Sequence, residues 1–211
     1  MVTTSHLPLT TPPSDTTTAS EPRVQPGDII LYPAQPGSWI DRLIVDATAQ
    51  GNPDAVYSHC GIVERVDVSP GDGAVQITTI EALSGGISRV TFPYLPDVPD
   101  TAGVSRAHVY AHIAQDMEPL RIAHALTWLG RTVGAGYSWL DIAADAVQAL
   151  LPPTLGSRTP FLIAPSRFDC SDLATRFLLI AGYEWLPDEA IAAPSRMSPN
   201  DVARMTGVLE P

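Results

Sequence analysis

The chain has 211 residues, enough for one domain with a sizeable core, and its 45% hydrophobic content fits a globular protein. Its 23 acidic residues outnumber 12 basic ones, for a net charge of −11, which argues against nucleic acid or an anionic membrane surface as partner. No apolar run is long enough for an integral membrane segment, and the N-terminus lacks a signal-peptide pattern. Two cysteines are too few for a disulfide framework. We expect a cytoplasmic, reduced protein, whose oligomeric state the sequence leaves unknown.

Composition divides the chain into two parts. Residues 1–26 are rich in Ser, Thr and Pro and offer almost nothing to bury, so we expect a disordered tail there. The folded domain is expected to span residues 27–211. No internal repeats are visible in it.

The first half of this domain reads as strands. Strands are predicted at residues 27–32, 57–65, 75–83, 87–92 and 104–112, with a short helix at 38–49. Short connections between sequential strands predict an antiparallel, meandering sheet. Because strand side chains alternate, His59 and Gly61 should share one face while Cys60 takes the other, so His59 and Cys60 should not converge. In the next strand, Glu81 should share a face with apolar neighbours.

The second half reads as helices. An amphipathic helix is predicted from residue 118 to about 130, marked by Leu120, Ala123, His124, Trp128 and Leu129, and further helices are predicted at 139–151, 170–181 and near 200–205. Gly182 is well placed just past the end of the third of these. Strands followed by helices predict an α+β fold.

Cys170 lies in the first turn of its predicted helix, with Asp169 or Ser171 available as the cap. Unsatisfied backbone N–H groups and the helix dipole favour an anion there and lower the pKa of a thiol. The carboxylates of Asp169 and Asp172 work against a second negative charge. Cys170 is therefore a candidate nucleophile, and the alternative is a small buried hydrophobic residue.

Cysteine catalysis needs a thiolate, a base and a group that orients the base. Cys60 is the other candidate nucleophile, in a less suitable position in mid-strand. The base must come from five histidines: His6, His59, His108, His112 and His124. His59 is favoured because Gly61, on the same face, leaves room beside it. Glu81 is the best-placed orienting group, and Glu64, which faces the other way, is the second choice.

Four segments in this order carry a family resemblance: Gly-Asp-Ile-Ile-Leu at 27–31, Tyr-Ser-His-Cys-Gly-Ile-Val at 57–63, Ile-Glu-Ala at 80–82 and Phe-Asp-Cys-Ser-Asp-Leu at 168–173. Together they resemble the circularly permuted papain-like hydrolases, the YiiX-like relatives of NlpC-type cell-wall peptidases and of lecithin:retinol acyltransferase. The order of histidine, polar residue and cysteine is the permuted one. The resemblance spans about residues 27–205, and Ser-Pro-Asn-Asp at 198–201 resembles the family's closing segment.

The resemblance implies a permuted papain-like fold, with an antiparallel sheet or small barrel packed against helices and the nucleophile at a helix N-terminus. Carried over by position, it makes Cys170 the nucleophile, His59 the general base and Glu81 the orienting group. Substrate contacts are expected from Tyr137, Tyr57 and Ser58. Tyr137 ends a stretch, 129–137, with more residues before the tyrosine than the family pattern has, and it is a candidate oxyanion donor. Cys60 replaces an expected aliphatic residue, which indicates core packing.

The implied function is a cysteine amidase or peptidase that forms a thioester acyl-enzyme with a small amide or peptide, such as a cell-wall-type peptide. A first alternative is a lipid acyltransferase or thioesterase with the same triad, disfavoured by the scarcity of basic residues and hydrophobic anchors. A second is a non-catalytic binding module that uses the same cleft. The resemblance implies no cofactor, and the sequence offers no ligand set for a metal.

Overall fold

Five antiparallel strands form the main sheet of the described chain, in the order β4-β3-β2-β1-β5. The computed structural model describes residues 24–48, 55–94, 108–137 and 167–209. The strands are β1 (Ile29–Pro33), β2 (Tyr57–Val68), β3 (Val75–Leu83), β4 (Gly86–Pro93) and β5 (Val109–Ala111). Consecutive strands β1 to β4 are neighbours, as the short connections predicted, and β5 returns beside β1. The fold is α+β.

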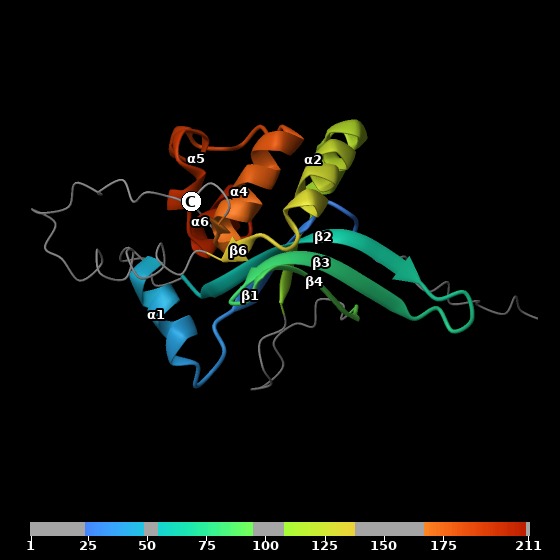
Figure 1. Cartoon of the computed structure of the whole chain (residues 1–211), viewed down its shortest axis with the longest axis horizontal. Coiled ribbons are helices and arrows are strands. Elements are labelled where there is room, and N and C mark those ends of the chain that lie inside the picture. The colour runs from blue at the N-terminus through green and yellow to red at the C-terminus, as the bar shows by residue number, and fades with distance from the viewer. Residues whose placement is uncertain (1–23, 49–54, 95–107, 138–166, 210–211) are drawn as a thin grey trace, which may run out of the picture.

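Helices α2, α4, α5 and α6 gather on one side of this sheet (Figure 1). The α-helices are α1 (Trp39–Thr48), α2 (Pro119–Thr132), α4 (Cys170–Ala181), α5 (Asp188–Ala192) and α6 (Pro199–Met205), with short 3-10 turns at Ala114–Asp116 and Pro194–Arg196. A small parallel pair joins β6 (Gly136–Tyr137) to β7 (Arg167–Phe168). No helix among these residues is long and apolar enough to cross a membrane.

Two apolar clusters lie on opposite faces of the sheet. The larger lies between the sheet and helices α2, α4 and α6, and includes Cys60, Ile62, Ile80, Cys170 and Phe177. The smaller, on the other face, joins Val24, Ile30, Val63, Ile77 and Tyr110. Alternation along β2 and β3 explains the division, because neighbouring residues on a strand point to opposite faces.

Most predicted elements agree with the structure to within a few residues. The helix expected at 139–151 and residues 1–23 of the expected tail lie outside the described residues. Val24 is buried, at 3% exposure, so packing begins three residues before the expected boundary at Gly27. The strand expected at 104–112 is described only from residue 108, where β5 covers Val109–Ala111.

The predicted face of helix α2 was wrong in part: Leu129 is buried as expected, but Leu120, Ala123 and His124 are exposed. Its buried residues are Ile122, Ala125 and Leu129, whereas Leu120 is 75% exposed. Pro119 occupies the first helical position. Because the helix begins there, Leu120 lies on its first turn, on the side away from the core.

Candidate active site

Cys170 is the first residue of helix α4, as expected. Of the two capping candidates the structure uses Asp169, whose Oδ1 accepts the Asp172 backbone N–H at 2.7 Å and the Ser171 hydroxyl at 2.9 Å. Gly182 ends the helix in the left-handed region, with φ of 74°. Most residues of α4 are buried, and the helix packs against strands β2 and β3.

His59 and Glu81 meet where the ladder between β2 and β3 ends. The last cross-strand pair is Gly61 with Glu81, two residues past His59. His59 Nε2 lies 2.9 Å from Glu81 Oε2. A Cβ on Gly61 would lie 2.6 Å from Glu81 Cγ, so the carboxylate can cross to His59 because residue 61 has no side chain.

Two hydroxyl groups fix the other oxygen of Glu81. Tyr32 donates to Oε1 at 2.6 Å and Thr79 donates to the same atom at 2.5 Å, which leaves Oε2 to His59. Tyr32 was missed by sequence reasoning. It pairs with His59 across β1 and β2, and their ring centroids are 5.2 Å apart. The role of Tyr32 follows from the register between β1 and β2, which the sequence alone does not show.

The Glu81 carboxylate stays charged despite its burial. Desolvation raises its pKa, but hydrogen bonds from His59, Thr79 and Tyr32 and the positive charge of His59 outweigh this, so the pKa is lowered. Glu64, the second candidate, is engaged elsewhere: Arg89 holds both of its oxygens, at 2.6 and 2.7 Å. Of the two carboxylates, Glu81 is therefore the one that hydrogen-bonds to His59.

His59 and Cys170 form a coupled acid–base pair. Burial lowers the pKa of His59, but the charge of the Cys170 thiolate and hydrogen bonds to Cys170 and Glu81 raise it to about 10. The pKa of Cys170 is held well below its usual value by a hydrogen bond from Cys60, against burial, and by the charge and hydrogen bond of His59. The favoured state at neutral pH is thus an imidazolium beside a thiolate.

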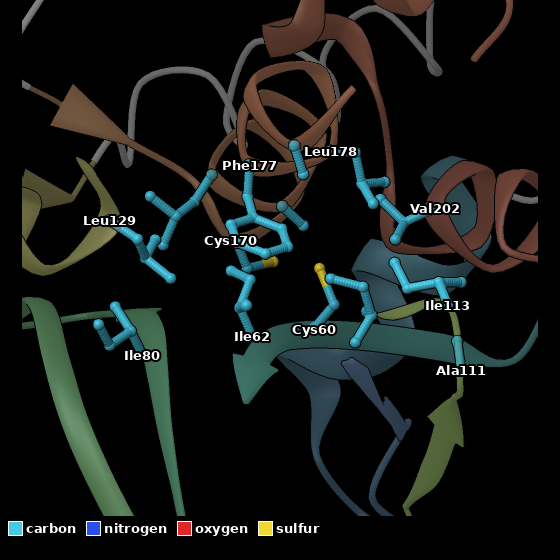
Figure 2. Packing of buried hydrophobic residues seen from close by; sticks show 14 of the residues in the cluster. Cys60, Ile62, Ile80, Ala111, Ile113, Leu129, Cys170, Phe177, Leu178 and Val202 are labelled. Carbon is cyan, nitrogen blue, oxygen red and sulfur yellow. The ribbon is translucent and has the colours of Figure 1, made fainter. Parts of the chain in front are cut away.

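His59 and Cys60 face opposite sides of β2, as expected, but both hydrogen-bond to Cys170. Figure 2 shows the sulfur atoms of Cys60 and Cys170 facing one another between β2 and α4. The Cys60 side chain and its backbone both hydrogen-bond to Cys170, which also hydrogen-bonds to His59. Alternation does place the two residues on opposite faces. His59 and Cys60 both reach the Cys170 sulfur because helix α4 packs on β2 near the end of the pairing between β2 and β3.

Tyr137 lies close to the pair although it is far away in sequence. Strand β6 pairs Tyr137 with Phe168, two residues before Cys170. Burial and the negative charge of Cys170 raise the pKa of its hydroxyl, so the group remains a hydrogen-bond donor.

The other two expected substrate contacts are placed differently. Tyr57 is 5% exposed and belongs to the core cluster, and Ser58 is 4% exposed. Asn200, from α6, holds this end of β2. Its Oδ1 accepts the Val56 and Tyr57 N–H groups at 3.1 and 3.0 Å, and its Nδ2 donates to the Tyr57 carbonyl at 3.1 Å. The segment 56–58 therefore supports His59 from inside the protein.

The carboxylates beside Cys170 are neutralised in different ways. Burial and the nearby thiolate raise the pKa of Asp169 well above its usual value, which favours its protonated form. Asp172 pairs with Arg176 at 2.7 Å. The repulsion expected from two free carboxylates is reduced accordingly.

The remaining histidines lie elsewhere. His112 Nδ1 lies 3.2 Å from Asp28, which ties the start of β1 to the segment after β5. His108 packs against the rings of Tyr32 and Phe92. His124 is exposed, and His6 lies outside the described residues.

A cavity of about 350 Å³ opens beside Glu81 on the face of the sheet opposite α4. It is lined by Tyr32, Glu81, Leu83, Val90, Phe92, Pro93 and His108. Its walls contain the orienting carboxylate and neither sulfur atom. The cavity therefore lies beside Glu81 and not beside Cys170.

The arrangement can generate and hold a thiolate next to a protonated base, with hydroxyl and backbone donors nearby. No group of three His, Cys, Asp or Glu side chains within the described ranges is arranged to hold a metal ion. The chain matches no protein-family model, no curated protein and no solved structure.

Proposed function

We propose that this protein is a cysteine hydrolase that cleaves a small amide or peptide through a thioester on Cys170. The observation that carries the proposal is the chain of contacts from Cys170 through His59 to Glu81, built from α4, β2 and β3. A thiolate, a base and an orienting carboxylate are the three parts that such catalysis needs. A module that only binds has no need of an ordered chain of this kind.

The reaction begins with attack of the Cys170 thiolate on the substrate carbonyl carbon. The carbonyl electrons move to oxygen, and the oxyanion is held by the Cys170 backbone N–H and the Tyr137 hydroxyl. His59, oriented by Glu81 through Nε2, gives a proton to the leaving amine as the C–N bond breaks. Neutral His59 then takes a proton from water, which attacks the thioester, releases the acid and regenerates the thiolate.

The order of these parts supports a permuted papain-like fold. The histidine strand β2 comes first, the carboxylate strand β3 second and the cysteine helix α4 last. The segment 198–201, expected as a closing motif, caps α6 reciprocally through Ser198 and Asp201, and Asn200 secures β2. The closing segment thus acts on the histidine strand itself.

The test is the rate of iodoacetamide alkylation at Cys170 between about pH 5 and pH 10. A paired thiolate reacts at neutral pH at least about tenfold faster than an ordinary thiol, since an unperturbed thiol is only a few per cent ionised there. His59→Ala should slow labelling about tenfold or more, and Cys170→Ser should abolish it. His124→Ala removes an exposed histidine and serves as the matched control, with no expected change.

Turnover is then measured on peptide amides and on acyl esters, with mass spectrometry for an acyl group on Cys170. Cleavage of amides with an acyl-Cys170 intermediate supports the proposal. A preference for long-chain acyl esters would support the lipid-directed alternative. Labelling at the rate of an ordinary thiol, unchanged by His59→Ala, would leave only a binding module.

A further inference from the structure

The two cysteines of the chain come together in the fold although they are 110 positions apart in the sequence. Cys60, from β2, is 1% exposed, and Cys170, from α4, is 5% exposed. Both belong to the core cluster between sheet and helices, and their sulfur atoms face each other in Figure 2. The catalytic proposal uses Cys170 alone, so the second thiol needs its own explanation.

A hydrogen bond links the Cys60 side chain to Cys170. A disulfide requires the sulfur atoms to approach to about 2.0 Å and the backbones to lie near enough for both Cβ atoms to point inward. Helix α4, which begins with Cys170, packs against β2, the strand that carries Cys60.

We propose that Cys60 and Cys170 are a redox modification site, at which hydrogen peroxide converts the nucleophile and its neighbour into a reversible disulfide. Cys170 is the thiol that reacts with peroxide, and Cys60 is the resolving thiol.

The first step oxidises Cys170. Its thiolate attacks one oxygen of hydrogen peroxide, an S–O bond forms and the O–O bond breaks, giving a sulfenic acid and hydroxide. The hydroxide takes a proton from the His59 imidazolium and becomes water. Peroxide is close to water in size, which suits a sulfur that is only slightly exposed.

The second step joins the two residues. The Cys60 sulfur attacks the Cys170 sulfur, the S–O bond breaks, and the departing hydroxide leaves as water with the Cys60 proton. In sum, two thiols and one peroxide give one disulfide and two waters, so each sulfur loses one electron and the peroxide oxygens gain two.

The environment assigns these roles. The hydrogen bond to Cys170, burial and the charge of the neighbouring thiolate raise the pKa of Cys60, so it stays protonated while Cys170 is ionised. Once Cys170 is a neutral sulfenic acid, the repulsive charge is gone and Cys60 can react. A resolving thiol next to a reactive one protects it from irreversible oxidation.

The consequence for catalysis rests on the proposed function, because a disulfide removes the nucleophile. Oxidised protein should lose activity and regain it with a dithiol reductant. The disulfide itself is measured without any substrate, which keeps the two proposals separable.

The experiment treats the full chain with equimolar hydrogen peroxide, followed by denaturation and N-ethylmaleimide. We expect a monomer about 2 Da lighter than the reduced chain that takes up no maleimide. Because the chain has two cysteines, such a monomer can contain only this bridge. Trypsin, which here cuts only after arginine, should release peptides 43–65 and 168–176 joined together. Dithiothreitol should restore two maleimide sites.

Two variants test the role of Cys60. In Cys60→Ser, the resolving thiol is absent, so Cys170 should gain about 16 Da and then about 32 Da as sulfenic and sulfinic acid. Cys60→Val gives the same prediction with an apolar side chain in the core, and thermal melts identify which variant stays folded. The wild-type measurement needs neither of them.

Three wild-type results would overturn the proposal: two free thiols after peroxide, accumulation of a sulfinic acid without a bridge, or a disulfide-linked dimer. Fast alkylation of Cys170 together with any of these would leave the hydrolase proposal standing. A disulfide formed by a protein that cleaves none of the amides or esters would support the redox site and remove its catalytic role.

Discussion

The charge of the Cys170 sulfur depends on two partners. Cys60 supplies a thiol donor and a backbone donor, and His59 supplies a positive charge and a hydrogen bond. Burial and the thiolate together raise the pKa of Asp169. His59 in turn depends on Glu81, whose other oxygen accepts hydrogen bonds from Tyr32 and Thr79. The reactivity of one atom therefore depends on residues from four different elements.

Replacing Glu81 should lower the pKa of His59. Glu81→Gln keeps the shape of the side chain but removes the charge that, with its hydrogen bond, helps to raise this pKa to about 10. We expect a fall of at least about one unit, equivalent to about 1.4 kcal/mol, and slower alkylation of Cys170. Histidine NMR titration measures the shift. Glu64→Gln, which breaks a pair with Arg89, is the matched control, and an equal shift there would contradict a specific role of Glu81.

A side chain at position 61 should displace the orienting carboxylate. In Gly61→Ala the new Cβ would lie 2.6 Å from Glu81 Cγ, so Glu81 must move away from His59. We expect destabilisation of about 1–3 kcal/mol and a loss of Cys170 reactivity similar to that of Glu81→Gln. Urea unfolding and alkylation rates measure the two effects. Gly71→Ala, at a turn with open space around it, should change neither.

Individual elements position the site through their ends. Helix α4 begins at Cys170, β3 ends its pairing with β2 at Glu81, and the first turn of α6 contains Asn200, which hydrogen-bonds to β2. Ends of elements leave backbone groups without regular partners, so they can bind side chains or substrate. A substitution at one of these ends should therefore change both the free energy of unfolding and the reactivity of Cys170.

The cap of helix α4 should be measurable through stability. Asp169→Ala removes the acceptor of the Asp172 N–H and of the Ser171 hydroxyl, and should cost about 1 kcal/mol. Asp169→Asn retains a good cap and is the control. Thermal or urea unfolding measures the loss of stability in each variant. If Asp169→Asn loses as much stability as Asp169→Ala, the charge of the side chain and not its capping bond matters at this position.

The hydrogen bonds of Asn200, which join α6 to β2, should contribute more to the free energy of unfolding than the cap of helix α4. Asn200→Ala leaves the buried Tyr57 N–H without its partner and removes the bonds to Val56 N–H and the Tyr57 carbonyl. A buried donor left unsatisfied costs about 1–3 kcal/mol, and we expect a total in the upper part of that range. Cys170 alkylation should also slow, because His59 follows this segment. If Asn200→Ala leaves the free energy of unfolding unchanged, these hydrogen bonds do not stabilise the fold.

For the whole molecule, the ion pair determines how stability depends on pH. His59 has a raised pKa, so its contribution is complete below its ordinary value of 6.5 and is lost as pH rises through about 10. Cys170 has a lowered pKa, so its contribution is complete above its ordinary value of 9.0 and is lost as pH falls. Between these values folding adds one proton to His59 and removes one from Cys170, and the two effects cancel.

We therefore expect the pair's contribution to the free energy of unfolding to be flat between 6.5 and 9.0 and to decline on both sides. Urea unfolding at a series of pH values, for the wild type and for the double variant His59→Ala, Cys170→Ser, isolates this contribution by subtraction. A difference that rises or falls steadily across the window would contradict a matched pair.

Sequence patterns predicted the elements better than their contacts. The alternation in residues 75–83 placed Ile77, Thr79 and Glu81 on one face, and the structure agrees. The Asp169 and Gly182 signals marked both ends of α4. These are local properties, determined by residues within one or two turns of each other. The face of α2 was read wrongly because several of its exposed residues are apolar too.

The sequence by itself indicated strands β1 to β5 and helices α1, α2, α4 and α6, the candidate triad of Cys170, His59 and Glu81, and the small size of residue 61. Only the tertiary structure decided that Glu81 and not Glu64 reaches His59, that Tyr32 and Asn200 support the site, and that Cys60 hydrogen-bonds to Cys170. The physical reason is that strand register and helix docking depend on how buried surfaces fit together. Residues far apart in the chain meet through that fit, and no local pattern encodes it.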